Sequence, residues 1–148
     1  MRQDGTFTSL GHLGETATGR GDAYARDCPT RQLLDRIGDK WSVLILLLLG
    51  DRELRFGQLK QRIGGISQKM LSQTLRALER DGLVTRHAVA TVPVSVSYRV
   101  TPLGRDLLAA LRLMIDWAET RMPEVAAAQG RYDTRAAADP ASSVLPAR

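Results

Sequence analysis

The sequence predicts a mainly α-helical domain with a small β-hairpin, arranged as a winged helix-turn-helix that dimerises through terminal helices. Three observations predict this fold class. A short segment with an apolar stripe and a longer amphipathic segment are separated by Gly64-Gly65, which is typical of a helix-turn-helix. Alternating apolar and polar residues then predict strands. A long apolar segment after them predicts a terminal helix.

The other elements are organised around residues 67–81, which read SQKMLSQTLRALERD. Ser67 is a favourable N-cap, because its hydroxyl can accept a backbone N–H that the first helical turn leaves unpaired. The apolar face consists of Leu71, Leu75 and Leu78, and the opposite face of Lys69, Ser72, Gln73 and Arg76. That polar face suits a DNA major groove, where long donors reach base edges, although an ordinary solvated helix face is the alternative.

Three helices are predicted before this one. The first covers about 30–37, with Thr30 as its cap and Gly38 as its end. The second, 41–49, reads WSVLILLLL and is predicted to be buried on most sides. The third, 56–63, is the first helix of the helix-turn-helix. The apolar stripes of the first and third helices consist of Leu33, Leu34, Ile37, Phe56, Leu59 and Ile63.

Two strands are predicted after Gly82, over about 83–89 and 94–100. The apolar face of the second consists of Val94, Val96, Tyr98 and Val100. Pro93 suits the hairpin tip, because it cannot donate a ladder hydrogen bond. Such a hairpin forms the wing. Arg86, His87 and Arg99 are the wing side chains expected to reach the DNA backbone, unless they are ordinary solvated strand residues.

A long helix is predicted from Thr101-Pro102 to about Arg121, with Pro123 marking its end. Its apolar surface exceeds what a compact winged helix can cover, so we expect it to pair with its copy in a homodimer. A two-fold protein matches a palindromic site. The predicted dimer interface consists of Leu107, Leu111, Met114, Ile115 and Trp117. The same lining could also hold a small apolar effector.

Composition and charge define the domain organisation and favour a polyanionic partner. The formal net charge is +5 and the pI is near 10.0. Between Arg55 and Arg86, Glu79 and Asp81 are the only carboxylates, so the basic excess lies around the predicted helix-turn-helix. We expect a flexible N-terminal arm over 1–25, a folded domain over 26–125 and a disordered tail over 126–148, because both ends lack apolar periodicity.

This chain lacks the residues that several other classes of protein need. The single cysteine, Cys28, allows no intrachain disulfide, which favours a reducing compartment. No apolar run approaches the roughly 20 residues of a membrane span, and no signal peptide is evident, so a cytoplasmic protein with no membrane partner is expected. His12, His87 and Cys28 form no recognisable catalytic or zinc-ligand pattern. We therefore expect no enzyme activity, no metal and no cofactor.

Several short motifs occur together between Cys28 and Trp117. They are Asp39-Lys40-Trp41, Arg55-Phe56, Gly65-Ile66-Ser67, Lys69-Met70-Leu71, Leu78-Glu79, Asp81-Gly82-Leu83, Tyr98, Thr101 and Gly104. In this combination the chain resembles the HxlR family of bacterial winged-helix transcriptional regulators, relatives of the MarR type. The resemblance implies a homodimer that places residues 67–76 in the major groove of an operator. The family usually has an acidic residue where this chain has Ser97, so a local ion pair of the wing is expected to be missing.

The resemblance also concerns Cys28. A cysteine before the first core helix is common in the family, and in some members it senses oxidants or electrophiles. Nearby cations and a helix N-terminus favour the thiolate, and Arg26 and Arg31 flank this cysteine. A half-buried packing cysteine is the alternative.

Together these features predict a sequence-specific DNA-binding transcriptional regulator, in the first place a repressor. It would act as a homodimer on a palindromic operator in double-stranded DNA and respond to an oxidant or a small effector. Lys69, Gln73 and Arg76 would contact bases or adjacent phosphates. The residues expected to fix the helix on the backbone or to serve the wing are Ser67, Gln68, Ser72, Arg86 and His87. The alternative is a winged-helix module that binds only protein.

Overall fold

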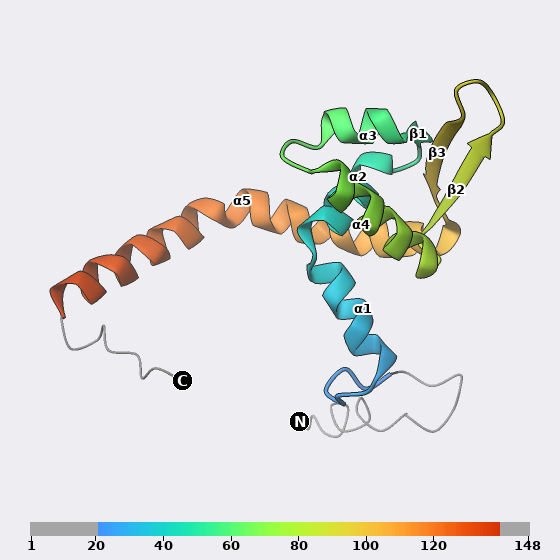
Figure 1. The fold of residues 1–148 in the computed structure, drawn as a ribbon. Helices are drawn as coiled ribbons and strands as arrows, with labels where there is room; N and C mark the ends of the chain where they lie inside the picture. The colour runs from blue at the N-terminus through green and yellow to red at the C-terminus, as the bar shows by residue number, and fades with distance from the viewer. Residues whose placement is uncertain (1–20, 140–148) are drawn as a thin grey trace. The chain divides into compact units, whose positions relative to one another are not determined.

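Five helices and three strands make up residues 21–139, the part of the chain that the computed structural model describes (Figure 1). In chain order they are α1 (Pro29–Gly38), α2 (Lys40–Leu49), β1 (Leu54–Arg55), α3 (Phe56–Arg62), α4 (Gln68–Arg80), β2 (Val84–Val89), β3 (Ser95–Val100) and α5 (Pro102–Ala138). They fall into two units, Met1–Leu108 and Ala109–Arg148, and α5 runs from the first into the second. The predicted winged helix-turn-helix is confirmed, and it lies in the first unit.

The wing is part of a small antiparallel sheet with strand order β1-β3-β2. β2 pairs with β3 in the register Val84 opposite Val100 and Arg86 opposite Tyr98. β1 pairs with the other edge of β3, with Leu54 opposite Tyr98. The predicted hairpin is therefore confirmed, and β1 is an addition that the sequence pattern did not predict, because two residues are too few to show an alternation.

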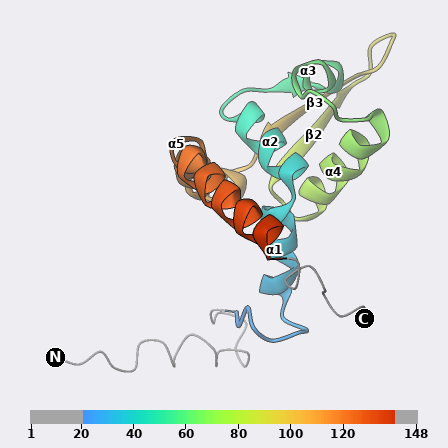
Figure 2. The same ribbon diagram turned by 90° about the vertical axis from the view of Figure 1, so that its left-hand side faces the viewer.

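The core forms where α2 and α4 pack on each other, and α4 also packs along β2 (Figure 2). The central side chains are Ile45, Leu46 and Leu49 of α2 and Leu71, Leu75 and Leu78 of α4, all of them fully buried. Asp39 caps α2: its Oδ2 accepts hydrogen bonds from Ser42 N at 3.1 Å and Ser42 Oγ at 2.8 Å. That hydroxyl is buried and therefore needs this partner. Leu44 is exposed, so α2 is buried on most sides but not on all.

The turn between α3 and α4 contains the glycine and the serine N-cap that the sequence predicts. Gly65 has φ +83°, a backbone conformation that glycine adopts without a Cβ penalty. Ile66 is buried directly after it. Ser67 Oγ accepts a hydrogen bond from Met70 N at 3.0 Å, which confirms Ser67 as the N-cap of α4. The helix ends at Arg80, and Gly82 follows with φ +75°.

α1 differs from its prediction in its start and in its burial. It begins at Pro29, so Cys28 and not Thr30 occupies the N-cap position, because proline fits the first helical position without needing an N–H partner. None of its residues is fully buried, and Leu33 and Leu34 are exposed. Its clearest link to the rest of the domain is an ion pair, in which Arg36 Nε donates to Oδ2 of Asp81, the C-cap of α4, at 2.7 Å.

α5 is much longer than predicted. It passes Arg121 and contains Pro123, and it ends at Ala138, so the disordered tail predicted from residue 126 is wrong at least as far as this helix extends. The residues after Pro123 are rich in alanine, a strong helix former, and their lack of apolar periodicity argues against burial but not against a helix. Residues 140–148 and the first twenty residues of the predicted arm lie outside the described residues. Within 21–139, no helix has both the length and the hydropathy of a membrane span.

The start of α5 packs closely against the sheet at Gly104. A Cβ atom at this position would lie 2.2 Å from Leu83 O and 2.6 Å from Val100 Cγ1, far inside contact distance. Thr101 fixes the same turn: its Oγ1 donates to Gly82 O at 2.6 Å and accepts from Gly104 N at 3.0 Å. The backbone carbonyl of Leu83 cannot move aside without disturbing the start of β2.

We expect Gly104→Ala to lower the free energy of unfolding by about 1–3 kcal/mol, because the added methyl group overpacks this contact. Thermal or denaturant unfolding measures the effect. Gly130→Ala is the matched control in the same helix: no atom lies within 4 Å of its added Cβ, and alanine is the better helix former, so it should be neutral or stabilising. Equal effects of the two substitutions would contradict the close packing at Gly104.

Candidate nucleic-acid interface

The polar face of α4 presents most of the predicted DNA-contacting side chains to solvent. The exposed members are Ser67, Gln68, Lys69, Gln73 and Arg76, and Ser72 is half-buried. Burial of the leucine face fixes this orientation. The Ser67 hydroxyl already accepts the cap hydrogen bond, but its own proton stays free to donate. The face therefore offers amide, ammonium, guanidinium and hydroxyl donors along one side of one helix.

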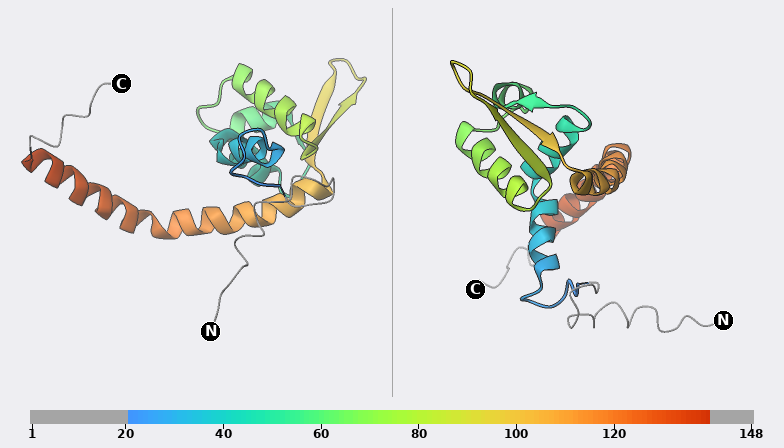
Figure 3. Two further views of the ribbon diagram at one scale, coloured as in Figure 1. Left: turned by 90° about the horizontal axis from the view of Figure 1, so that it is seen from below. Right: turned by 90° about the vertical axis from the view of Figure 1, so that its right-hand side faces the viewer.

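A groove runs between α4 and the wing. Ser72, Arg76 and Glu79 line it on the helix, and Arg86 and Tyr98 line it on the hairpin. Arg55 and Phe56, where β1 meets α3, also line it. The hairpin extends past α4, as the right-hand view of Figure 3 shows. The structure thus brings together Arg76 and Arg86, which the sequence placed in separate elements.

The two predicted wing residues Arg86 and His87 lie on opposite faces of the sheet. Neighbouring residues of a strand point to opposite sides. Arg86 pairs with Tyr98, which is buried, and it lines the groove beside α4. His87 pairs with Ser97 on the other face. Arg86 and His87 therefore cannot meet the same segment of DNA backbone in the way that their adjacency in the sequence suggests.

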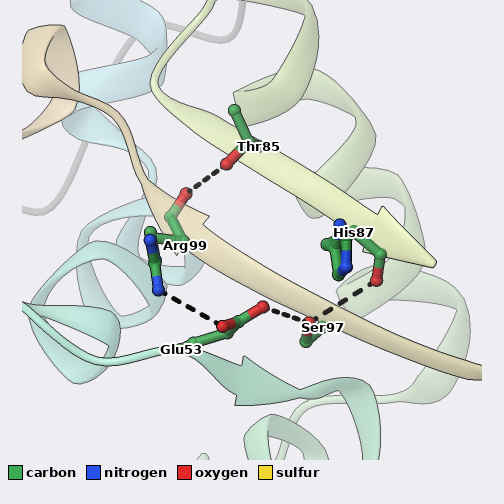
Figure 4. A network of polar contacts seen from close by, with 5 residues as sticks. All are labelled: Glu53, Thr85, His87, Ser97 and Arg99. Atoms are coloured by element: carbon green, nitrogen blue, oxygen red, sulfur yellow. Dashed lines mark hydrogen bonds and ion pairs between the residues drawn. The ribbon is translucent and has the colours of Figure 1, made fainter. Parts of the chain in front are cut away.

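The face of the wing that carries His87 has its own polar network, centred on Glu53 (Figure 4). Ser97 Oγ donates to Glu53 Oε1 at 2.6 Å, and Arg99 Nη2 lies 3.4 Å from Glu53 Oε2. The Ser97 hydrogen bond lowers the pKa of the Glu53 carboxyl, and the charges of Arg99 and His87 lower it further. The expectation that the wing lacks an ion pair is therefore wrong, because Glu53 supplies the carboxylate from the segment before β1.

This network also involves Arg99, which the sequence offered as a wing contact. Its guanidinium is turned toward Glu53 and away from the groove that Arg86 lines. Sequence reasoning missed Glu53 because it lies far from Ser97 in the chain and joins it only through the pairing of β1 with β3.

Cys28 occupies the N-cap position of α1 and is half-buried. Hydrogen bonds lower the pKa of its thiol: the Thr30 side chain is the largest cause and the Thr30 backbone N–H the next. The sequence had attributed thiolate character to the flanking arginines and the helix start. The structure assigns the lowered pKa first to a hydroxyl two residues along the chain. The backbone N–H of Thr30 in the first turn of α1 agrees with the expected effect of the helix start, whereas the charges of the flanking arginines are not among the causes.

The residues predicted to form the dimer interface differ in how exposed they are to solvent. Leu111 is 2% exposed in the single chain, so almost none of its surface is free to meet a partner. Leu107 and Ile115 are half-buried, Met114 is exposed, and Trp117 is 60% exposed. Other large apolar side chains exposed on α5 are Leu103, Leu113, Met122 and Tyr132. The helix thus carries an extensive uncovered apolar surface.

Comparison with known proteins identifies the family. The profile of the HxlR-like helix-turn-helix family matches residues 36–126, well over half of the chain. The chain belongs to the HxlR-like family. The uncharacterized HTH-type transcriptional regulator YtfH of Escherichia coli (strain K12) is 43% identical over 117 residues, which cover 79% of this chain and 90% of that protein.

Solved structures of similar proteins share the HxlR-like fold. The structure of a ytfH transcriptional regulator from Salmonella typhimurium has 40% identity and a TM-score of 0.72, and the match covers 75% of this chain and 99% of that one. The redox regulator HypR in its reduced form has 33% identity and a TM-score of 0.62, with 67% and 98% covered. The chain is accordingly an HTH-type transcriptional regulator and not an enzyme, and its helix-turn-helix implies DNA binding.

Proposed function

We propose that this chain is a sequence-specific repressor that binds a palindromic operator as a homodimer in the cytoplasm. The observation that carries the proposal is the exposed polar face of α4, rich in donors, next to a groove that continues onto the wing. With α4 in a major groove, its long side chains reach base edges and its short ones reach phosphates. A protein seated on a promoter excludes other proteins from it, which makes repression the expected outcome.

Roles follow from position on the interface. Lys69, Gln73 and Arg76 lie at helical spacing on the exposed face and would read bases or adjacent phosphates. Ser67, Gln68 and Ser72 would fix the helix on the backbone. Arg86 would contact the backbone from the wing, whereas the position of His87 opposite Ser97 leaves it a lesser role.

We expect Arg76→Ala to weaken binding to the operator by about 10-fold or more, because one good base contact is worth about 1–3 kcal/mol of discrimination. The measurement is binding to a labelled fragment from upstream of the protein's own gene, against unrelated DNA, across a salt series. Arg131→Ala on α5 is the control, since it removes the same charge from an exposed position outside α4 and the wing.

Unchanged affinity of Arg76→Ala at several salt concentrations would remove Arg76 from the interface. Equal, weak and salt-sensitive binding of the wild type to both fragments would contradict specific readout of the chosen fragment. No binding even at low salt would favour a winged helix that binds only protein.

Dimerisation is proposed to use the exposed apolar surface of α5. Met114 and Trp117 lie one helical turn apart and are both exposed. Because both side chains are large and apolar, their exposure to water is unfavourable in free energy. A symmetric pair of such helices would bury them against their copies. Two recognition helices would then meet half-sites about one DNA turn apart.

We expect Trp117→Asp to raise the dimer dissociation constant at least about 30-fold, because large buried aromatic side chains at an interface are typically worth about 2 kcal/mol or more. Sedimentation equilibrium measures it against a chain mass of 16.3 kDa. Val92→Asp is the control, since it places the same charge on a fully exposed valine of the wing tip. A monomeric wild type, or equal dissociation by both variants, would contradict the assignment.

Oxidant responsiveness is the proposed form of regulation. Its support is the lowered pKa of the Cys28 thiol, its position at the start of α1, and the likeness to the redox regulator HypR. With one cysteine in each chain, an oxidant can join two Cys28 thiols of different chains, or one of them and a small thiol, into a disulfide. As each disulfide forms, the two thiols that it joins lose two protons and pass two electrons to the oxidant.

We expect a thiol oxidant to change operator affinity in the wild type and to leave Cys28→Ser unaffected. Thr30→Val should fall between them, because loss of the hydroxyl raises the pKa of Cys28 and leaves less thiolate at neutral pH. Affinity measured with and without oxidant, together with the rate of thiol alkylation against pH, separates the three proteins. An equal oxidant response of Cys28→Ser would contradict the proposal.

A further inference from the structure

α1 is joined to the later elements by a single polar contact. Arg36 Nε donates to Asp81 Oδ2 at 2.7 Å, and within residues 21–139 no other hydrogen bond or ion pair links a side chain of α1 to a later element. Arg31, the other arginine of this helix, donates to the nearby carbonyl of Tyr24. Because α1 buries no side chain completely, the Arg36–Asp81 pair is its best-defined attachment.

This ion pair is partly withdrawn from solvent. The Arg36 side chain keeps 28% of its exposure and the Asp81 side chain 21%. Partly buried charges attract each other more strongly than fully exposed ones, because less water screens them. Loss of Arg36 would leave the Asp81 carboxylate partly buried and without its partner, which is unfavourable in free energy.

Asp81 lies at the junction between α4 and the wing. It is the C-cap of α4, and its backbone N–H closes the last turn of the helix. Gly82 follows with a positive φ, and its carbonyl accepts a hydrogen bond from Thr101. Asp81 comes five residues after Arg76 and five before Arg86, the predicted DNA contacts of α4 and of the wing. The geometry of this junction therefore sets how the two contacts are placed relative to each other.

The end of a helix is also sensitive to the sign of a nearby charge. The C-terminus of α4 carries a partial negative charge, which disfavours a carboxylate and favours a cation. Asp81 alone is unfavourable at this position, and the Arg36 guanidinium offsets it. Arg36 belongs to the last turn of α1, so a folded α1 holds it at Asp81. An unfolded segment would have to be ordered before it could make the same contact.

We propose that Arg36 is a positioning residue for the DNA-binding surface: acting through Asp81, it couples the folding of α1 to the placement of α4 and the wing. The inference rests on the proposed function. It adds to the determinants of DNA affinity an element, α1, that supplies none of the predicted DNA contacts. A folded α1 fixes the α4–wing junction before DNA arrives, so less order has to be gained on binding.

The experiment compares variants of the full-length protein on the upstream fragment and on unrelated DNA over a salt series. Asp35→Pro unfolds α1, because proline inside a helix of 10 residues removes a hydrogen bond and clashes with the preceding turn. Asp35→Ala is its matched control, since it removes the same charge and keeps the helix. Arg36→Ala removes the ion pair, and Arg31→Ala removes the same charge from the same helix without affecting Asp81. Thermal unfolding and sedimentation verify the fold and the oligomeric state of each variant.

We expect Asp35→Pro and Arg36→Ala each to weaken binding to both DNAs about 5-fold or more, as is typical of coupling between two sites. The double variant should bind as the weaker of the two does, because both changes break the same link. The slope of log K against log salt should stay that of the wild type, because no phosphate contact is lost. If α1 acted independently of Arg36, the two losses would add.

Asp81→Ala separates positioning from the long-range effect of charge. It removes a negative charge from a protein that binds a polyanion, so charge alone predicts tighter binding, opposite to Arg36→Ala. Loss of the link predicts weaker binding for both variants.

Tighter binding by Asp81→Ala, additive losses, or wild-type affinity of Asp35→Pro would each overturn the proposal. If the wild type binds both DNAs equally, sequence-specific repression fails, but the losses on unrelated DNA still decide whether Arg36 positions the surface. Absence of any DNA binding by the wild type would overturn both proposals.

Discussion

Burial of one face of α4 against α2 is the constraint from which the rest of the interface follows. Leu71, Leu75 and Leu78 are withdrawn from water almost completely, and each such side chain contributes about 1.5–3 kcal/mol. Because a helix is rigid, fixing this face also fixes the opposite one. Lys69, Gln73 and Arg76 are therefore held outward without any contact of their own, and the polar face is oriented before a ligand arrives.

The sheet imposes a second constraint, which concerns charge. Strand alternation sends Arg86 to the groove face and His87 to the other, and β1 brings Glu53 to the second face only. On one face of the wing the Glu53 carboxylate consequently pairs with Arg99, while on the other face, within residues 21–139, Arg86 keeps an unpaired positive charge. The overall charge of +5 says less about function than this division, which places Arg86 beside the polar face of α4.

Features with strong local periodicity were predictable from the sequence. The leucine spacing and the Ser67 cap define α4, and the alternation around Tyr98 defines the hairpin, so the winged helix-turn-helix followed from local patterns. Features that depend on long-range pairing were not predictable: β1 is two residues long, and Glu53 meets Ser97 only through the sheet.

The end of α5 was predicted wrongly and the burial of Leu111 was not foreseen, for different reasons. Pro123 usually interrupts a helix, and the alanine-rich segment after it lacks an apolar stripe, so neither feature revealed that the helix continues. Leu111 belongs to an apolar series that contains buried and exposed members alike, and spacing alone does not separate them. The DNA-contacting residues themselves remain a prediction, supported by exposure and by position on α4.

The lack of burial in α1 makes the domain uneven in local stability. An isolated helix of 10 residues is marginal in water, and this one buries no side chain completely. Its backbone amides should therefore exchange with solvent through a local opening that costs much less than global unfolding. Such an opening would release the end of α4 from Arg36 while the leucine core stays intact. We therefore expect the segment that carries Cys28 to open and re-form while α4 stays folded.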